Sequence, residues 1–415
     1  MMDNKNKRSL GSILLIIFRI VLILFAAFII FVFIEFKDEL LTVSSVKEII
    51  PLDSEKAYPV YSIDIHGNYY MENFIKKGGV NSTEDLVSFL TKEMSRGYYE
   101  LDKDSISPGG CSSFTAENKK GERIFARNYD MDAKSPIALV HTKPSDGRYE
   151  SISTVNLEYL GFDKDGITSF FDRFVSNAAA YLPMDGMNEK GLGISIHMSH
   201  QGPGDKNNPT DQRSEKFDVT STSMMRLILD RASNVEEAVE ICKNIDLHDD
   251  IGYSFHYIVC DESGNSAVLQ WVNGTDSIDT DGSKRELIVT YQKDRNDFIT
   301  SDNYRILTNF ITLDYYNDSD KLSGLDRFQI LENKLSPVNG VIKDEKEAMD
   351  LLKQVSSKRD SSKNYDHTLY SVVYNLSNKT LNLVPNENYD DEDMIISYKL
   401  GDWNILLVVF KIQIN

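Results

Sequence analysis

The residues that decide the fold lie between positions 109 and 130, and they read GGCSSFT at 109–115 and FARNYD at 125–130. The first stretch predicts a strand over Cys111–Glu117, and the second belongs to a strand over Glu122–Asn128. The residues Asn118–Gly121 between them are typical of a tight turn, so the two strands form a β-hairpin. A cysteine therefore opens a strand directly after a flexible Pro-Gly-Gly segment.

In this position the thiol of Cys111 can act as a nucleophile on the preceding peptide bond. The carbonyl of Gly110 precedes it, and glycine imposes little steric barrier on the strained geometry that attack by the thiol requires. If the bond between the two residues is cut, one residue carries a thiol and a free α-amine. That amine has a pKa of about 7.7–8.0 and can act as the base for its own nucleophile. A buried structural cysteine at a strand start explains the same residues, and the local pattern leaves both interpretations open.

The rest of the chain alternates strand-like and helix-like stretches. Further hairpins are predicted at 256–272 and 370–384, where two apolar runs flank a short polar turn. Helices are predicted over Thr220–Arg231 and from Asn234, which has a glutamate three residues later. Hairpins grouped around a helical middle predict an α+β fold, with helices packed on antiparallel sheet.

The order of the motifs resembles the choloylglycine hydrolase and penicillin V acylase family, N-terminal-nucleophile amidases with acid-ceramidase-like and acyltransferase relatives. In that family the mature chain begins with the nucleophilic cysteine, and an Arg-Asn-x-Asp motif follows, as Arg127–Asp130 does here. Later segments are similar in the same order, namely Asp185–Leu192, Leu307–Asn309, Asp326–Phe328 and 368–381. The resemblance implies an Ntn-hydrolase αββα four-layer sandwich and hydrolysis of a linear amide C–N bond.

The resemblance also implies roles for five residues. Cys111 is the nucleophile, and its freed amine is the base. Arg127 orients the thiol and lowers its pKa, since a nearby cation favours the thiolate. Asp130 accepts from the α-amino group, and Asn309 donates to the oxyanion as its charge develops. Arg327 completes the charge network.

Two features complicate these roles. Strand alternation places Arg127 and Asp130 on opposite faces, so we expect them to share a site only if the strand ends or kinks near Asn128. Many family members have Asn or Tyr where this chain has Met198. His197 or a backbone N–H is therefore expected as the second oxyanion donor, and His197 and Met198 are expected to contact the substrate.

An apolar run over Ile13–Ile34, interrupted only by Arg19, predicts a membrane-spanning helix. A helix of this length rises about 33 Å, enough to cross a hydrocarbon core of about 30 Å. Basic residues precede the run and acidic residues follow it, which places the following residues outside the cell. A cleaved signal peptide is the alternative, although its apolar region is usually shorter. The predicted organisation is a cytoplasmic tail at 1–12, a transmembrane anchor at 13–36, an extracytoplasmic linker or propeptide at 37–110, and an amidase domain at 111–415.

Composition narrows the class of protein. The 415 residues carry a net charge of −19, which argues against a nucleic-acid partner because phosphate binding needs a basic surface. Hydrophobic residues make up 41% of the chain, enough for a packed globular domain rather than a disordered one. Three cysteines cannot form a disulfide-dense scaffold. Cys242 and Cys260 are predicted to be core residues, with a disulfide between them as the alternative.

The histidines offer two other chemistries. His197 and His200 have metal-pair spacing but lie on opposite faces of a strand, so we expect no metal, and we expect no cofactor. His256 or His367 paired with Cys111 would make a conventional Cys-His enzyme, but the surrounding sequence lacks a papain-like signature.

We interpret the chain as a membrane-anchored, extracytoplasmic N-terminal-cysteine amidase that acts on a small N-acyl amide through a thioester. Acyl transfer to an amine, and an inactive uncleaved surface protein, are the alternatives. The substrate classes left open are conjugated bile salts, phenoxyacyl penicillins, acyl-homoserine lactones and N-acyl amino acids. Loops within 131–183 and 198–219 are expected to form the pocket. The sequence also leaves a homo-oligomer open.

Overall fold

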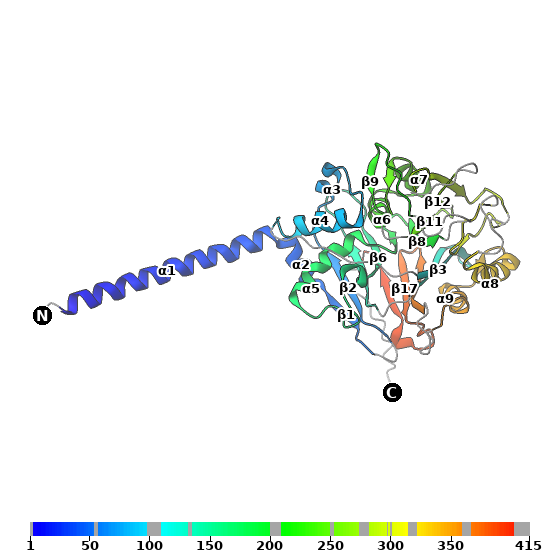
Figure 1. Cartoon of the computed structure of the whole chain (residues 1–415). Coiled ribbons are helices and arrows are strands. Elements are labelled where there is room, and N and C mark those ends of the chain that lie inside the picture. Colours follow the sequence, from blue (N-terminus) through cyan, green and yellow to red (C-terminus); the bar gives the residue numbers. More distant parts are fainter. Residues whose placement is uncertain are drawn as a thin grey trace, which may run out of the picture.

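A long helix, α1 (Asp3–Glu35), projects from a body formed by the other elements (Figure 1). The computed structural model describes residues 3–53, 57–97, 109–131, 135–199, 209–249, 253–273, 282–296, 298, 301–313, 322–358 and 367–401. Over Gly11–Glu35, α1 is long and apolar enough to cross a membrane, and its side chains there are exposed. Its length and composition therefore fit the predicted anchor.

The larger of the two main sheets has nine strands. In spatial order these are β1 (Lys47–Ile50), β2 (Val60–Ile65), β5 (Ile137–Thr142), β6 (Ser151–Asn156), β7 (Asp185–Asn188), β8 (Gly193–Ser199), β11 (Ser254–Cys260), β12 (Ser266–Val272) and β13 (Glu286–Tyr291). Only the pair β2 and β5 is parallel; the other neighbours in this sheet are antiparallel. The hairpin predicted at 256–272 is confirmed as β11 and β12.

The smaller main sheet has seven strands and contains the two other predicted hairpins. Its members are β14 (Ile306–Leu307), β3 (Gly109–Asn118), β4 (Arg123–Met131), β16 (His367–Asn375), β17 (Thr380–Pro385) and β18 (Ile396–Lys399), with β15 (Val341–Ile342) also paired to β3. The hairpin of β3 and β4 places Cys111 opposite Tyr129 and Ser113 opposite Arg127. Each strand extends a few residues beyond the predicted bounds.

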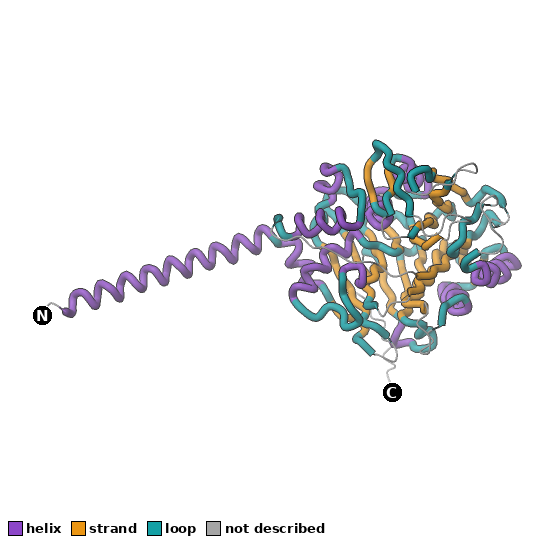
Figure 2. The backbone as a smooth tube through the Cα atoms, in the orientation of Figure 1, coloured by secondary structure: helices purple, strands orange, loops and turns teal. Residues whose placement is uncertain are grey.

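The two sheets pack face to face, and helices cover their outer sides (Figure 2). Strand β3 contacts β8 across the interface. On the outer side of the larger sheet lie α6 (Ser221–Arg231) and α7 (Val235–Lys243), and on that of the smaller sheet lie α8 (Leu325–Leu335) and α9 (Glu345–Gln354). The predicted four-layer αββα sandwich is therefore confirmed.

The start of α7 shows how the local sequence sets an element. The side chain of Asn234 accepts a hydrogen bond from the backbone N–H of Glu237 at 2.9 Å, which satisfies one of the free donors of the first turn. The residues of α7 that face inward are buried, and they have the 3-4 spacing of an amphipathic helix. The predicted start of the helix at Asn234 is confirmed, and Cys242 is buried as predicted.

Residues 37–97 contribute to the body rather than forming a tether. They supply α2 (Lys37–Ser45), α3 (Met71–Lys77) and α4 (Thr83–Met94) in addition to the edge strands β1 and β2. Strand β2 is buried and lies between β1 and β5 in the larger sheet. Within the predicted linker or propeptide, this stretch is thus folded onto the body, because its strands complete a sheet whose other seven members follow Cys111. Residues 98–108, just before the predicted cut, lie outside the described residues.

Candidate active site

Cys111 lies near the start of β3 with its thiol between the two sheets. Its side chain is buried, and its sulfur accepts a hydrogen bond from Nη2 of Arg127 at 3.3 Å. Its backbone N–H donates to Oδ1 of Asn309 at 2.9 Å, and its carbonyl accepts from Nη1 of Arg327 at 2.7 Å. Three of the four other predicted catalytic residues therefore contact Cys111 directly.

Arg127 is fixed in the space between the sheets. Its guanidinium forms an ion pair with Asp185 on β7 at 3.1 Å and donates to the carbonyls of Met184 and, at 2.7 Å, Ile196. The side chain is fully buried, so its charge depends on these partners for compensation. Held by both sheets, Arg127 presents one N–H to the sulfur of Cys111.

Asp130 and Arg327 lie on the other side of the hairpin, toward α8. Oδ2 of Asp130 pairs with Nη1 of Arg327 at 3.1 Å, and Oδ1 accepts from the hydroxyl of Thr368 at 2.6 Å. Nη2 of Arg327 also donates to Oδ1 of Asn309 at 2.7 Å. In the uncut chain the N–H of Cys111 is thus bonded to Asn309, and Asp130 reaches Cys111 through Arg327.

Strand alternation predicted this separation of Arg127 and Asp130 correctly, but the condition given for a shared site, a strand end or kink near Asn128, is not met. Strand β4 continues to Met131, and the irregularity in register falls on its neighbour β16, between Thr368 and Tyr370. The two residues serve one site because Cys111 lies between them. Its side chain faces Arg127, and its backbone faces the pair of Asp130 and Arg327.

Asn309 bridges the two sheets at the nitrogen of Cys111. Its Nδ2 donates to the carbonyl of Met198 at 2.7 Å, while its Oδ1 accepts from Cys111 and Arg327. A side-chain amide carries two N–H groups, so one remains for an oxyanion. The residue follows the short strand β14, which pairs with β3 at Ser113 and Phe114.

Of the two residues expected to contact the substrate, only one is in the right place. Met198 lines the cavity beside Cys111. His197 points instead between the sheets, where Nε2 lies 2.9 Å from the hydroxyl of Ser113 and 3.0 Å from that of Ser195. Burial, followed by the positive charge of Arg127, keeps its pKa well below the usual value. The expected role of His197 as a substrate or oxyanion contact is therefore corrected: it is a neutral, structural histidine.

The thiol of Cys111 is not activated in the uncut chain. Burial raises its pKa above the ordinary value, and this outweighs the opposing effects of Arg127 and Arg327. Burial likewise raises the pKa of Asp130 despite the attraction of Arg327. The predicted effect of Arg127 on the thiol is confirmed in its direction, because the guanidinium lowers the pKa of Cys111, but burial has the larger effect. Release of the α-amine would add a positive charge beside the sulfur.

Cys111 lines a deep cavity whose walls are mostly apolar. One wall is α4, which precedes the predicted cut, and another is α5 (Phe170–Val175) with the residues that follow it. The apolar lining includes Leu86, Val87, Leu90, Met94, Phe171, Phe174, Val175, Ala178, Leu182, Met184, Ile196 and Met198. The predicted pocket segment 131–183 contributes part of this wall. Residues 200–208 of the other segment lie outside the described residues.

The other cysteines and histidines have structural surroundings. All three cysteines are free, so the alternative disulfide between Cys242 and Cys260 is not formed. His256 lies 2.9 Å from the carbonyl of Thr308, and the ring of His367 packs against Tyr58. The sulfur of Cys111 contacts Arg127 instead, which does not favour a conventional Cys-His pair.

The family model for the acyl-coenzyme A:6-aminopenicillanic acid acyl-transferases matches residues 116–389. The chain belongs to this family. The match begins five residues after Cys111 and includes four of the five predicted catalytic residues. The predicted kinship with N-terminal-nucleophile amidases and acyltransferases is therefore confirmed.

Solved structures give a more distant likeness. Two variants of the conjugated bile acid hydrolase from Clostridium perfringens are 18% and 19% identical, each with a TM-score of 0.47, covering 71% of this chain and 94% of theirs. The penicillin V acylase from Agrobacterium tumefaciens is 16% identical with a TM-score of 0.42, covering 66% of this chain and 83% of its own. No curated protein matches the chain.

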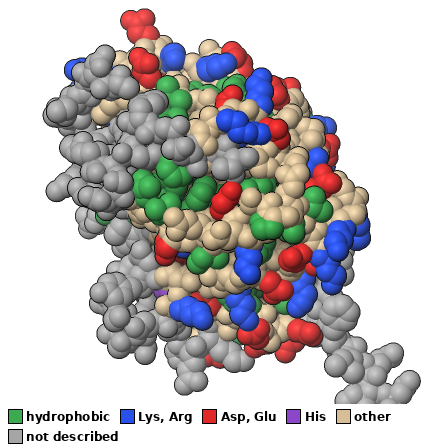
Figure 3. All heavy atoms as spheres, turned by 90° about the vertical axis from the view of Figure 1, so that its right-hand side faces the viewer, with side chains coloured by type: hydrophobic (Ala, Val, Ile, Leu, Met, Phe, Trp, Pro, Cys, Tyr) green, Lys and Arg blue, Asp and Glu red, His purple; other side chains and the backbone are tan. Residues whose placement is uncertain are grey.

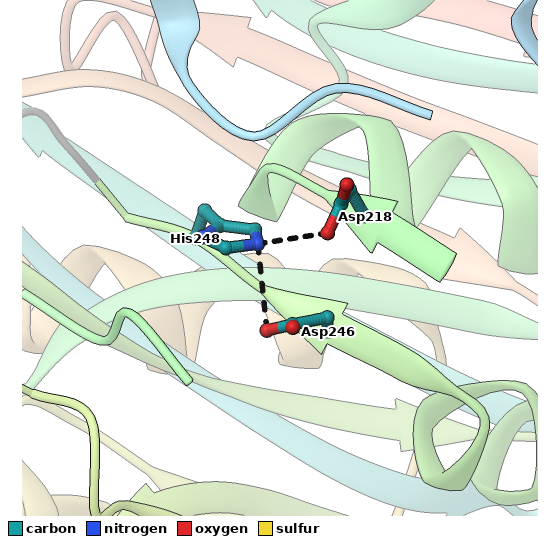
Figure 4. Close-up of side chains that lie close together, drawn as sticks. All are labelled: Asp218, Asp246 and His248. Atoms are coloured by element: carbon teal, nitrogen blue, oxygen red, sulfur yellow. Dashed lines mark hydrogen bonds and ion pairs between the residues drawn. The ribbon is translucent and has the colours of Figure 1, made fainter. Parts of the chain in front are cut away.

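This family member also contains a charged cluster that the sequence analysis missed. Nε2 of His248 lies 3.1 Å from Asp218 and 3.4 Å from Asp246 (Figure 4). Its Nδ1 lies 2.9 Å from Asp211. Asp218, Asp246 and His248 are close enough to hold a metal ion together. Burial lowers the pKa of His248, but its carboxylate partners, Asp211 and Asp218 first, outweigh this effect and raise it. The partners come from β9 (Phe217–Val219), β10 (Ile245–Leu247) and a loop, which explains why no local motif indicates them.

Proposed function

We propose that the chain is a membrane-anchored, extracytoplasmic amidase whose nucleophile is the N-terminal cysteine released by a cut between Gly110 and Cys111. One observation carries this proposal. The nitrogen, carbonyl and sulfur of Cys111 are each held by a different predicted catalytic residue, at the wall of an apolar cavity. Such a convergence is not needed to bury a structural cysteine.

The cut would involve the thiol of Cys111 and the carbonyl of Gly110, which directly precedes it in the chain. The thiol of Cys111 attacks the carbonyl carbon of Gly110, and the C–N bond breaks as the nitrogen takes the proton that the thiol gives up. Water then hydrolyses the resulting thioester to a carboxylate on Gly110 and a free thiol. A side chain at position 110 would lie 3.1 Å from the carboxylate of Asp130, so glycine allows this close approach.

Turnover then follows the same chemistry on an external amide. The freed α-amine takes the thiol proton, the sulfur attacks the acyl carbon, and Asn309 can donate its remaining N–H to the oxyanion. The amine gives its proton to the leaving nitrogen as the C–N bond breaks, and water releases the acid from the thioester. Asp130 would accept from the new α-amine on the α8 side, and Arg327 would hold the Asp130 carboxylate in place.

After the cut, fragment 1–110 would stay with the body through noncovalent packing. Strand β2 pairs with β5 over Val60–Ile65, and α4 forms a wall of the cavity. His141 on β5 lies 3.1 Å from Asp64 on β2 and 2.8 Å from Glu150, which adds a charged contact across the two pieces. The anchor in α1 could thus still hold the catalytic part.

Acyl transfer is the second candidate, because the matching family model is named for an acyl-transferase. The same thioester serves both reactions, and only the acceptor differs. The test is a panel of N-acyl amides, with the thioester on Cys111 trapped by acid quenching and located by mass spectrometry. Added amines would give new amides if the enzyme transfers acyl groups, and free acid alone if it hydrolyses. Full turnover without any acyl mass on the fragment that carries Cys111 would refute both candidates.

A further inference from the structure

The junction between α1 and the body is held by one arginine. Arg96, just after α4, pairs with Glu35 at the end of α1 at 3.1 Å and with Glu39 on α2 at 2.9 Å. Its guanidinium also lies 4.8 Å from the ring centre of Phe36, between the two helices. These contacts hold the end of α1 against the body. If α1 spans a membrane, the side of the body next to α1 therefore faces that membrane, and α2, α4 and α5 lie on this side (Figure 1).

Two phenylalanines are exposed on this side. Phe170 and Phe171 open α5, and 64% and 55% of their surface is accessible. The position of α5 is fixed, because Nη1 of Arg173 donates to the carbonyl of Val46 at 2.9 Å and the ring of Phe174 packs against Phe36. Exposure of two adjacent aromatic rings to water is unfavourable, and it is typical of a surface that meets another apolar phase.

The face of the body on the side away from α1 carries interspersed acidic and basic side chains around a group of apolar ones (Figure 3). Phenylalanine rings beside a membrane-spanning helix lie where aromatic residues meet the bilayer interface. The position of the two rings next to the end of α1 therefore favours lipid over water as their surroundings.

The same helix connects this surface to the nucleophile. Phe171, Phe174 and Val175 line the cavity that contains Cys111, and α4 forms the neighbouring wall. Of the two exposed rings, Phe171 is thus also part of the cavity rim, whereas Phe170 is not among the lining residues. A substrate with a long apolar chain could pass from the bilayer along α5 without crossing water.

We propose that Phe170 and Phe171 insert into the interface of the bilayer that holds α1, so that the cavity receives bilayer-resident N-acyl amides through a rim at the membrane. This inference rests on the proposed amidase function and on the proposed anchor. The contact of the two rings with lipid is tested separately from the amidase function and from the anchor.

The contact is tested with added tryptophans in the full chain, reconstituted into vesicles of phosphatidylcholine whose acyl chains are brominated near the carboxyl end. The unmodified chain, with its two native tryptophans, gives the baseline. Phe170→Trp is expected to be quenched about twofold more than Val338→Trp, an exposed site just after α8 on the far side of the body. Phe25→Trp, in the middle of α1, reports the anchor in a second set of vesicles, whose acyl chains are brominated near the terminal methyl group.

The outcomes separate the proposals. Quenching at both positions 25 and 170 supports the interface contact. Quenching at position 25 alone leaves the anchor intact and overturns the inference. If position 170 is then also shielded from aqueous acrylamide, another protein copy covers the rings instead of lipid. No quenching at position 25 overturns the anchor, and the inference with it.

The route of the substrate is tested by activity. Phe170 does not line the cavity, so Phe170→Ser should leave turnover of a soluble short-chain amide unchanged. Turnover of a long-chain N-acyl amide embedded in the vesicles should fall roughly tenfold, because one aromatic ring leaves the interface. Val338→Ser is the matched control and should change neither rate. Equal rates of Phe170→Ser and the unmodified enzyme on the embedded substrate would overturn the route, while activity on the soluble substrate still reports the amidase.

Discussion

The surroundings of Cys111 differ from those of Cys242 and Cys260, although all three thiols are free and buried. Cys242 lies 3.8 Å from the sulfur of Met224, and Cys260 lies 3.8 Å from the carbonyl of Gly193. Burial raises the pKa of each thiol, Cys111 included. What distinguishes Cys111 is therefore not burial but two guanidinium groups, an amide and an open cavity. Cys111 therefore differs from the two core cysteines in its hydrogen-bond partners and in its access to the cavity.

The largest expected effect tests this difference directly. Cys111→Ala should abolish the cut and lower amidase turnover by about 10⁴-fold or more, because no other group can form the thioester. Cys260→Ala, the matched control, should keep turnover within about twofold, since it removes only a core contact. Initial rates on the best substrate of the panel, measured on folded samples of both variants, check the prediction. Equal losses of turnover in the two variants would show that Cys111 is not functionally distinct from Cys260.

Asn309→Ala should have the next largest effect. Loss of one oxyanion donor typically lowers kcat by about 10²–10³-fold. The control is Asn382→Ala on β17, where the half-buried amide accepts from Ser397 at 2.6 Å and lies outside the site. Steady-state kinetics of both variants check this. An unchanged kcat in Asn309→Ala would show that Asn309 is not the oxyanion donor.

The raised pKa of Cys111 predicts how the rate of the cut between Gly110 and Cys111 depends on pH. Because burial raises this pKa in the uncut chain, the thiolate is scarce near neutral pH and increases as pH rises. The cutting rate should therefore rise by up to about tenfold per pH unit between pH 7 and 8. Time courses of fragment formation measure it. A rate that is flat or falls across this range would indicate that deprotonation of the thiol does not control the cut.

The smallest expected effect concerns His141, which contacts Asp64 across the two predicted fragments. Burial lowers the pKa of His141, but hydrogen bonds to Asp64 and Glu150 outweigh this and raise it. A raised pKa means that the protonated form stabilises the fold. This contribution is complete below about pH 6.5, the ordinary histidine pKa, and is lost as pH rises through the raised value.

His141→Gln should therefore cost about 1–2 kcal/mol at pH 6 and less at higher pH, as expected for hydrogen bonds to charged groups. Urea unfolding at several pH values tests this, with Cys111→Ala used throughout to keep the chain intact. A cost that grows with pH would contradict the assigned direction.

The sequence predicts what is local or ordered by motif, and it fails where distant residues meet. The hairpin of β3 and β4 follows from its turn and its strand pattern, and both strands were expected. Asn309 and Arg327 lie about 200 residues from Cys111, so no periodicity could bring them there, and only the motif resemblance indicated them.

What the sequence did not predict is the tertiary position of several residues and elements. The stretch Glu84–Met94 has helical spacing, but nothing local indicates that α4 forms a wall of the cavity. Two histidine environments were missed for the same reason. His197 turns away from the cavity because its strand face is buried between the sheets, and His248 collects carboxylates from three separate segments.

The N-terminal sequence of the purified catalytic part tests the central claim most directly. Intact mass and Edman analysis of the full chain, kept at pH 8 for a day, should show two pieces, 1–110 and 111–415, with cysteine as the new first residue. The Cys111→Ala chain, treated in parallel, should stay whole. A chain that remains uncut while turning over an amide at full rate would contradict the account, because the proposed base would not exist.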